Sequence, residues 1–241
     1  MRLVADVLDE GSYLEAIIDQ SVTTAMRPHP GLRRMLVPIG PVAVFGASNF
    51  SLAFSVPGGD AVSALAAGSP VVIKAHDSHP ATSNLCAELL RKVVGDIGAP
   101  DGTVGLLHGQ ASGAKLGTHP AVKAVGFTGS LSVGREIFQQ RRTARSVANA
   151  AFIAHRHHPQ PTGESGVRAG GHHGGPWPST NTSQTSVGPT AIRRFLRPLT
   201  WQDSPEHLLP VELREDNRDV PRRIDGELVQ AALPRQMTEQ G

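Results

Sequence analysis

The stretch Gly40-Pro41-Val42-Ala43-Val44-Phe45-Gly46 decides the fold class of this chain. A turn-forming Gly-Pro pair precedes a short apolar run of β-prone residues, which predicts a buried strand. The segment from Gly58 to Ala67 follows, rich in alanine and leucine, with Pro57 near its start and Gly68 just after its end. This asymmetry is typical of a helix, so a strand-helix alternation begins here.

The alternation continues toward the C-terminus. We predict strands at 70–74, 103–107 and 121–127, the last reached through the short segment 111–117, and a closing helix at 133–140. The helix entered through Ser78-His79-Pro80 carries an apolar stripe that recurs every four residues, at Leu85, Leu89, Val93 and Ile97. Because helices between strands favour parallel pairing with right-handed crossovers, we expect a four-stranded, Rossmann-like parallel α/β unit over residues 36–140.

Polar residues follow three of the predicted strands, as Ser48-Asn49, as Lys74 and as Thr128-Gly129-Ser130. Ligands of parallel sheets bind at the carboxyl ends of the strands, so these three clusters are expected to converge. Gly129-Ser130 precedes a helix, whose N–H groups and dipole favour a phosphate. The sequence therefore predicts a nucleotide site. The alternative is that these polar residues only form the turns that follow strands. It stays open because the chain lacks the G-x-G-x-x-G fingerprint of dinucleotide sites.

The chain changes character near residue 140. Residues 141–241 contain 13 Arg and no Lys, and the regular hydrophobic periodicity stops. Residues 154–190 are rich in His, Gly, Pro, Ser and Thr, a composition that favours loops. We therefore expect residues 141–184 to be mostly irregular and the chain to end in an irregular C-terminal tail.

Composition excludes several classes of function. A formal net charge of +2 with 4% aromatic residues indicates neither a nucleic-acid nor a membrane partner. The sequence has no secretory signal and no apolar run of about 18 residues. The single cysteine, Cys86, excludes an intrachain disulfide and fits a cytoplasmic location. No Cys or carboxylate accompanies the histidines at ligand spacing, which predicts no metal site at His155, His157, His158, His172 and His173.

Three motifs in order carry a resemblance to a known family. They are Val37 to Phe50 (VPIGPVAVFGASNF), Gly68 to Lys74, and Phe127-Thr128-Gly129-Ser130 followed by Val133-Gly134. At this spacing they resemble the cofactor-domain motifs of the aldehyde dehydrogenase family. The residues around Asn49 and Lys74-Ala75-His76 are closest to the α-ketoglutaric semialdehyde (2,5-dioxopentanoate) dehydrogenases of that family.

The tail resembles the C-terminal end of the same subfamily. The matching segments are His173 to Thr180, Thr185 to Gly188, Arg194 to Pro198, Pro205 to Pro210 and Arg222 to Gly226. The resemblance divides the chain into an N-terminal helix and connector (1–35), an NAD(P)-binding segment (36–140), an unmatched junction (141–161) and a C-terminal segment (162–241). We expect a chain truncated at its N-terminus that lacks the family's central catalytic segment.

The resemblance implies roles for single residues. Asn49 would donate its amide to the oxygen of the thiohemiacetal intermediate, although Ser51 replaces the proline usual after Asn-Phe. Lys74 would contact the adenosine ribose. His76 and Asp77 stand where the family distinguishes NAD from NADP, so either NADP or NAD is the expected cofactor. The other implied cofactor-binding residues are Gly129 and Ser130 at the pyrophosphate, with Phe127, Thr128 and Val133 lining the site.

Two groups that the family's chemistry needs are missing. A cysteine thiol attacks the aldehyde and a glutamate activates water. Ala151-Phe152-Ile153-Ala154 stands where the glutamate is expected, and Cys86 is interpreted as a small apolar helix residue. Intact relatives would be homo-oligomers that oxidise a small acidic aldehyde such as 2,5-dioxopentanoate, whereas this chain is expected to be inactive.

Two other readings stay open at the level of sequence. The chain is a non-catalytic nucleotide-binding or partner module in the first. In the second it is a degenerate fragment, because the strands of its tail would have no catalytic domain to pair with and would leave unsatisfied edges.

Overall fold

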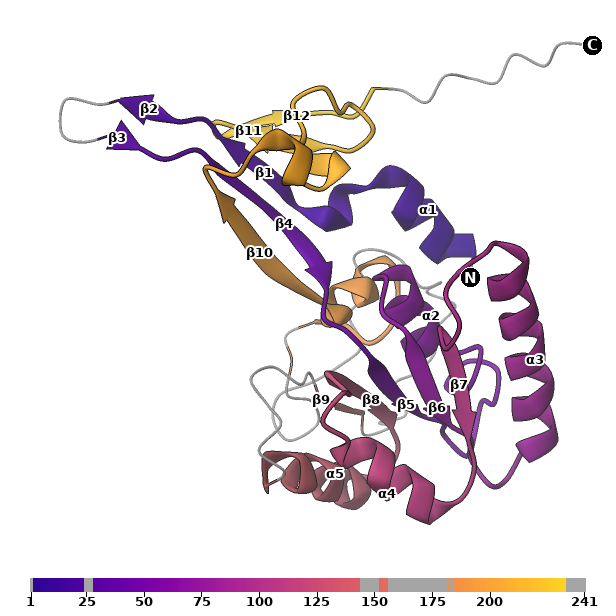
Figure 1. The fold of residues 1–241 in the computed structure, drawn as a ribbon. Coiled ribbons are helices and arrows are strands. Elements are labelled where there is room, and N and C mark those ends of the chain that lie inside the picture. Colours follow the sequence, from indigo (N-terminus) through magenta and orange to yellow (C-terminus); the bar gives the residue numbers. More distant parts are fainter. Residues whose placement is uncertain (1, 24–27, 144–151, 156–181, 183, 233–241) are drawn as a thin grey trace, which may run out of the picture. The chain divides into compact units, whose positions relative to one another are not determined.

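The computed structural model describes residues 2–23, 28–143, 152–155, 182 and 184–232, and these divide into two compact units (Figure 1). The first unit comprises Met1–Val4 and Pro38–Leu196. The second comprises Ala5–Val37 and Arg197–Gly241. The helix α1 (Arg2–Glu10) therefore begins in one unit and ends in the other.

A parallel sheet forms the centre of the first unit. Its strand order is β7-β6-β5-β8-β9, and every pair of neighbours runs parallel. The sequence of strands and helices thus gives the expected α/β class. The strands are β5 (Val42–Phe45), β6 (Val71–Lys74), β7 (Val104–Leu107), β8 (Ala124–Thr128) and β9 (Phe152–His155).

Four helices connect these strands (Figure 1): three were predicted, and the fourth, α4 (Gln110–Thr118), forms where the sequence indicated only a short segment at 111–117. Gly68 follows the first of them with a φ of +79°, a conformation that favours glycine at the end of a helix. The helices are α2 (Gly59–Ala66), α3 (Pro80–Asp96), α4 (Gln110–Thr118) and α5 (Leu131–Thr143).

The four parallel strands expected over residues 36–140 are present, and a fifth strand from beyond that range joins them. β9 lies in the segment 141–184, which the sequence indicated to be mostly irregular. It pairs parallel with β8, from Val125 opposite Phe152 to Thr128 opposite His155. A four-residue strand in a segment rich in Arg, Ala and His shows no periodicity of its own, and its partner strand lies more than twenty residues back in the sequence.

Both faces of this sheet are covered, as in other parallel sheets. The side chains of Val42, Val44, Val71, Ile73 and Val125 are at most 1% exposed. A cluster beside α4 and α5 buries one face, and it consists of Ala43, Leu116, Val122, Val125, Phe127 and Ile137. The edge where the strands end is therefore held on a rigid, close-packed base.

The apolar stripe of α3 is not the face that packs on the sheet. Its four residues, Leu85, Leu89, Val93 and Ile97, are 56–74% exposed. The small residues Ser83 and Ala87 are buried instead, and Arg91 donates from Nε to the carbonyl of Val104 in β7 at 3.0 Å. Small residues allow α3 to approach β7 closely, and the apolar stripe therefore faces outward.

The second unit contains its own five-stranded sheet, in the order β10-β4-β1-β11-β12. β1 pairs antiparallel with β4 and parallel with β11, and β11 pairs antiparallel with β12. Its members are β1 (Ala16–Asp19), β4 (Leu32–Pro38), β10 (Leu196–Gln202), β11 (Arg222–Ile224) and β12 (Glu227–Val229), and β2 (Val22–Thr23) forms a separate pair with β3 (Pro28–His29).

This sheet corrects two expectations. The segment that follows α1 is not a plain connector, because it supplies β1 and β4. The C-terminal tail is not irregular throughout, since three strands accompany its 3-10 helices η2 (Pro189–Phe195), η3 (Glu206–Leu208) and η4 (Val211–Leu213). These strands also have partners. The two segments bury a shared core of Leu14, Ala16, Ile18, Met35, Leu209 and Leu213, next to η1 (Ser12–Leu14).

A buried ion pair joins the tail to α2 within the first unit. Arg194 donates from Nη1 to Asp60 Oδ1 at 2.7 Å, and the Arg194 side chain is fully buried. Its other donors reach the carbonyls of Ser186 and Ala191. The guanidinium also lies 4.9 Å from the ring centroid of Phe195. All three donor nitrogens of Arg194 therefore have an acceptor, which a buried charge requires.

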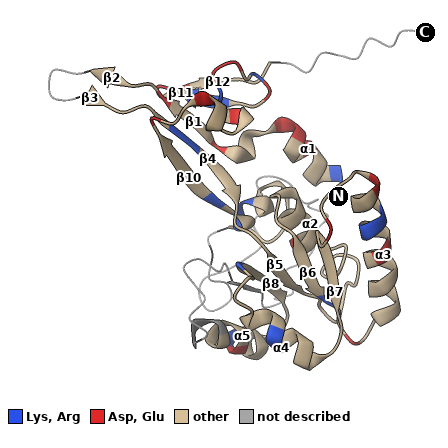
Figure 2. Cartoon of the chain, viewed as in Figure 1, with Lys and Arg blue, Asp and Glu red and all other residues tan. Residues whose placement is uncertain are grey.

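Charged residues of both signs are spread over the described ribbon (Figure 2). None of the described helices is long and apolar enough to cross a membrane.

We predict that Asp60→Ala lowers the free energy of unfolding by about 3 kcal/mol, because it leaves the buried Arg194 charge without its counter-ion. Urea denaturation followed by circular dichroism measures the change. Lys92→Met is the matched control, since it removes the exposed Lys92–Asp96 pair and should cost about 0.5 kcal/mol or less. Equal losses in the two variants would contradict the assigned role of the Arg194–Asp60 pair.

Candidate functional site

A cavity of about 740 Å³ lies at the carboxyl ends of the central strands of the first unit. Its wall includes Lys74 from β6, Thr128 from β8, and the ends of α4 and α5. Phe45 and Phe127 meet edge to face in this wall, with ring centroids 6.3 Å apart. The cavity volume falls within the range of about 300–1,000 Å³ that is usual for small-molecule sites.

A second cavity, of about 520 Å³, adjoins the first. It contains Asn49, together with the apolar residues Phe50, Phe54 and Leu131. The two cavities share part of their wall, which is formed by Ala47, Ser48, Thr128, Gly129 and Ser130. An extended ligand can therefore run from one cavity to the other along the shared wall.

The structure brings nearly all the sequence-predicted site residues to this one edge. Seven line the larger cavity, namely Lys74, His76, Phe127, Thr128, Gly129, Ser130 and Val133. Asn49 lies in the smaller cavity. Asp77 lines neither cavity, but its Oδ1 is 3.3 Å from Lys74 Nζ. The three polar clusters after β5, β6 and β8 thus converge because the strands that precede them are parallel neighbours.

Lys74, in the wall of the larger cavity, pairs with Asp77, which lies just outside that wall, and the two form a half-buried corner. The Lys74 side chain is 11% exposed and the Asp77 side chain 57% exposed. The aliphatic part of Lys74 is packed, since a Cβ at Gly113 would lie 3.3 Å from Lys74 Cγ. The ammonium group is thereby aimed at the cavity, where it can meet hydroxyl or phosphate oxygens of a ligand.

His76 is neutral in this corner at neutral pH. Burial lowers its pKa below the ordinary 6.5, and the positive charge of Lys74 lowers the pKa further. His79 acts in the same direction, whereas Asp77 opposes it. His76 Nδ1 accepts a hydrogen bond from the backbone N–H of Ser78 at 3.2 Å.

The N-terminus of α5 meets the wall that the two cavities share. Ser130 precedes Leu131, the first residue of α5, and its carbonyl accepts from Gly134 N at 3.0 Å. Ser130 Oγ lies 3.2 Å from Ser132 Oγ and 3.4 Å from Val133 N. First-turn N–H groups of a 13-residue helix carry partial positive charge, so this wall suits an anion.

The loop that carries Asn49 is held by its own backbone. Ala47 N donates to Phe54 O at 2.8 Å, and both Ala53 N and Phe54 N donate to Phe50 O. Phe50 adopts a φ of +50°, which is uncommon for a residue with a Cβ. The Asn49 amide has no hydrogen-bond partner among the described residues, so it remains able to bind a ligand oxygen.

Sequence reasoning missed the contribution of α4 and of the outer part of α5. Gly113, Ala114 and Gly117 form a row of small residues that lines the larger cavity, and Glu136 and Gln140 line it from α5. Gln140 Nε2 donates to Glu136 Oε1 at 3.0 Å. The spacing of these small residues could have indicated this wall from the sequence. Small residues on one face of a helix let a flat ligand group approach the backbone closely.

The remaining candidates lie elsewhere. Cys86 lies on α3, outside the residues that line either cavity. His157, His158, His172 and His173 lie outside the described residues, and His155 belongs to β9. No group of three or more His, Cys, Asp or Glu side chains in the described residues could hold a metal ion.

Comparisons with known proteins point to one family. The model of the aldehyde dehydrogenase family matches residues 4–151. An α-ketoglutaric semialdehyde dehydrogenase 2 of Azospirillum brasilense is 50% identical over 143 residues, which are 58% of this chain and 27% of that protein. An α-ketoglutaric semialdehyde dehydrogenase of Acinetobacter baylyi is 47% identical over 139 residues, which are 57% of this chain and 26% of that protein.

The chain thus spans about a quarter of the length of these two curated relatives. A crystal structure of Mycobacterium tuberculosis aldehyde dehydrogenase complexed with NAD+ is similar to it at 23% identity. The TM-score is 0.48, and the match covers 64% of this chain and 29% of that one.

We predict that His76 titrates with a pKa below 6.5, as measured by NMR of its imidazole resonances against pH. Lys74→Met should raise this pKa, because it removes a neighbouring positive charge. Asp77→Asn should lower it further, because it removes the carboxylate that favours the imidazolium. A wild-type pKa at or above 6.5 would contradict the geometry of this corner.

Proposed function

Because the chain belongs to the aldehyde dehydrogenase family, we propose that its first unit binds NAD or NADP along the two adjoining cavities. The observation that carries this proposal is the shared wall of Ala47, Ser48, Thr128, Gly129 and Ser130. It joins the Lys74 corner to the Asn49 corner across the N-terminus of α5. This surface fits a ligand that has an anionic group in its middle, at the N-terminus of α5, and one further group in each cavity.

The residues present fit a dinucleotide. The pyrophosphate would lie against the first turn of α5, where Ser130 and the helix N–H groups favour negative charge. Lys74 Nζ would donate to ribose hydroxyls in the larger cavity. The row of small residues on α4 leaves room for a planar base, because each larger side chain there would fill the cavity.

Asn49 would bind the aldehyde in the smaller cavity, at the opposite end of the site from Lys74. Its amide N–H groups would donate to the oxygen of an aldehyde in the smaller cavity and stabilise negative charge that develops there. Phe50, Phe54 and Leu131 would exclude water around that oxygen. When bound, the nicotinamide supplies the hydride acceptor for the oxidation of the aldehyde.

We propose that intact relatives of this chain oxidise a small acidic aldehyde such as 2,5-dioxopentanoate, and that this chain does not. The reaction needs a thiol, and the one cysteine lies on α3 rather than at the cavities. We also propose that intact relatives are homo-oligomers, and that this chain, with its single cysteine, is cytoplasmic.

A second candidate is a nucleotide-binding module that performs no chemistry. The observation that favours it is that no cysteine is among the described residues that line the two cavities. Both candidates have this chain bind the cofactor without reducing it, and the second takes that binding to be the chain's own function.

We predict that the purified chain binds NAD+ or NADP+ in isothermal titration calorimetry without reducing it when 2,5-dioxopentanoate is added. Lys74→Ala should weaken binding by about tenfold, because it removes a charge-assisted hydrogen bond. Lys115→Ala on α4 is the control, and it should bind as the wild type does. Aldehyde-dependent formation of NADPH or NADH that disappears in Asn49→Ala would overturn the inactivity.

We predict that Asp77 favours NAD+ over NADP+, because its carboxylate at the Lys74 corner would repel a 2′-phosphate. Asp77→Asn should shift the ratio of the two dissociation constants toward NADP+ by about fivefold to tenfold. Asp101→Asn serves as the control, since that exposed carboxylate lies beyond the C-terminal end of α3. An unchanged ratio in Asp77→Asn would show that another group selects the cofactor.

A further inference from the structure

The start of α3 makes a contact that none of the family's implied roles uses. His79 is the residue immediately before α3, at the position that usually caps the helix through a short polar side chain. Its side chain makes no cap hydrogen bond. Instead Nε2 lies 2.8 Å from the carbonyl oxygen of Ala47, a residue 32 positions earlier in the chain.

Both backbone polar groups of Ala47 are therefore hydrogen-bonded. Its N–H donates to Phe54 O at 2.8 Å, and its carbonyl accepts from His79. Ala47 is itself 5% exposed. Ser48 and Asn49 follow directly, and Phe50 adopts a positive φ. A loop that contains such a strained residue keeps one conformation only if its neighbours fix it.

The His79 ring is oriented from its other side by Ser83. Ser83 Oγ lies 3.3 Å from His79 Nδ1 and 3.1 Å from the His79 carbonyl oxygen, and Ser83 is 2% exposed. Because Ala47 O only accepts, Nε2 must carry the proton of this hydrogen bond. Ser83 Oγ, within hydrogen-bond distance of Nδ1, holds the plane of the ring in the orientation that aims Nε2 at Ala47 O.

The contact joins two loops that carry different parts of the site. The β6–α3 loop contains His76 and Asp77, and the His76 and His79 rings lie 5.8 Å apart at 32°. The β5–α2 loop contains Asn49. The ladder between β5 and β6 ends with Gly46 N donating to Lys74 O, at the point where the two loops begin. The His79–Ala47 hydrogen bond links them again.

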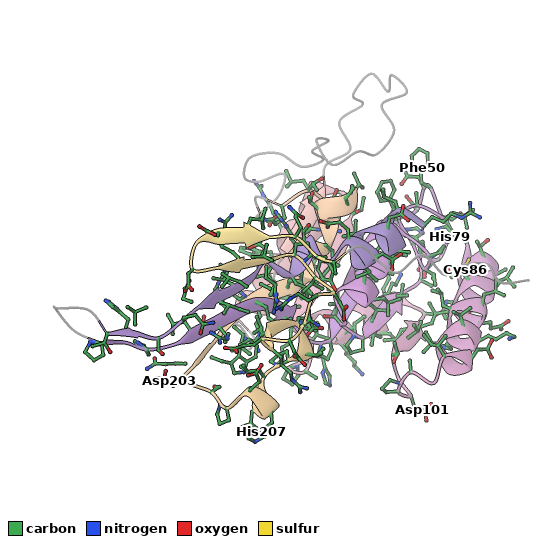
Figure 3. All side chains as sticks on the ribbon, turned by 90° about the horizontal axis from the view of Figure 1, so that it is seen from above. Phe50, His79, Cys86, Asp101, Asp203 and His207 are labelled. Carbon is green, nitrogen blue, oxygen red and sulfur yellow. The ribbon has the colours of Figure 1, made fainter. Side chains whose placement is uncertain are left out.

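We infer that His79 is a positioning residue that fixes the Ala47–Asn49 segment against the β6–α3 loop and thereby aligns the two cavities for one dinucleotide. This inference rests on the proposed function of the site. His79 lines neither cavity, so it acts through Ala47 and not by touching the ligand. Figure 3 labels it at the start of α3, with Asp101 beyond the other end of that helix.

The test compares ligands of two lengths. His79→Ala should weaken NAD+ or NADP+ binding by roughly threefold to tenfold, the contribution of one hydrogen bond. AMP lacks the part of the dinucleotide that would lie beside Asn49, so its binding should weaken less, by under about twofold, although Ala47 and Ser48 also line the larger cavity. His79→Gln should restore dinucleotide binding, because its terminal amide can donate to Ala47 O. Equal weakening of AMP and dinucleotide, or none of either, would overturn the inference.

His108→Ala is the matched control. His108 contacts α3 through a 2.9 Å hydrogen bond to Asn84, yet it lines neither cavity. It should leave the affinities for both ligands unchanged, while circular dichroism confirms that every variant is folded.

Hydrogen exchange without any ligand separates this inference from the proposed function. The amides of Ala47 and Phe54 should exchange about threefold to tenfold faster in His79→Ala than in the wild type and in His79→Gln. If the wild-type chain binds no nucleotide, the proposed function fails, and the exchange rates still decide the role of His79. Unchanged exchange at Ala47 and Phe54 would contradict that role.

Discussion

The parallel pairing of β5 with β6 and β8 is the constraint on which the rest of the site depends. Val42 lies opposite both Val71 and Ala124, and Phe45 lies opposite both Lys74 and Phe127. Since the three strands stay in register and run the same way, whatever follows each of them emerges at one edge. Burial on both faces fixes that register, because a slip of one residue would turn apolar side chains away from the core.

Chemistry at this edge then follows from what each strand delivers. β6 ends in a lysine whose stem is packed and whose ammonium group faces a cavity. β8 leads into the positive end of α5, and β5 leads into the loop of Asn49. The buried Arg194–Asp60 pair, to which Arg194 contributes from 134 residues away, fixes the first turn of α2, the helix that follows that loop. Residues with no chemical role thus decide where the polar groups lie.

Sequence reasoning predicted the parts whose signals are local. The four strands and the helices α2, α3 and α5 between residues 42 and 143 carry their own apolar run or a terminal Pro or Gly, whereas α4 has no apolar run and was not predicted. Sequence reasoning missed β1, β9 and the strands of the tail, because short strands become stable only through partners far away in the sequence. It also missed the role of His79, which depends on its contact with Ala47, and that of the row Gly113, Ala114 and Gly117, which depends on the cavity that the row lines. The apolar stripe of α3 shows that a local signal can also mislead, because its periodicity predicted the helix correctly but the stripe itself is exposed.

The most direct test of the central claim is a map of backbone amide chemical shifts as NAD+ is added to the 15N-labelled chain. The account predicts that the largest shifts fall at the ends of β5, β6 and β8, at Ser48, Ala75 and Ser130, and at the first turn of α5. Shifts confined to one of these strand ends, or scattered over the second unit, would contradict a single dinucleotide site at this edge.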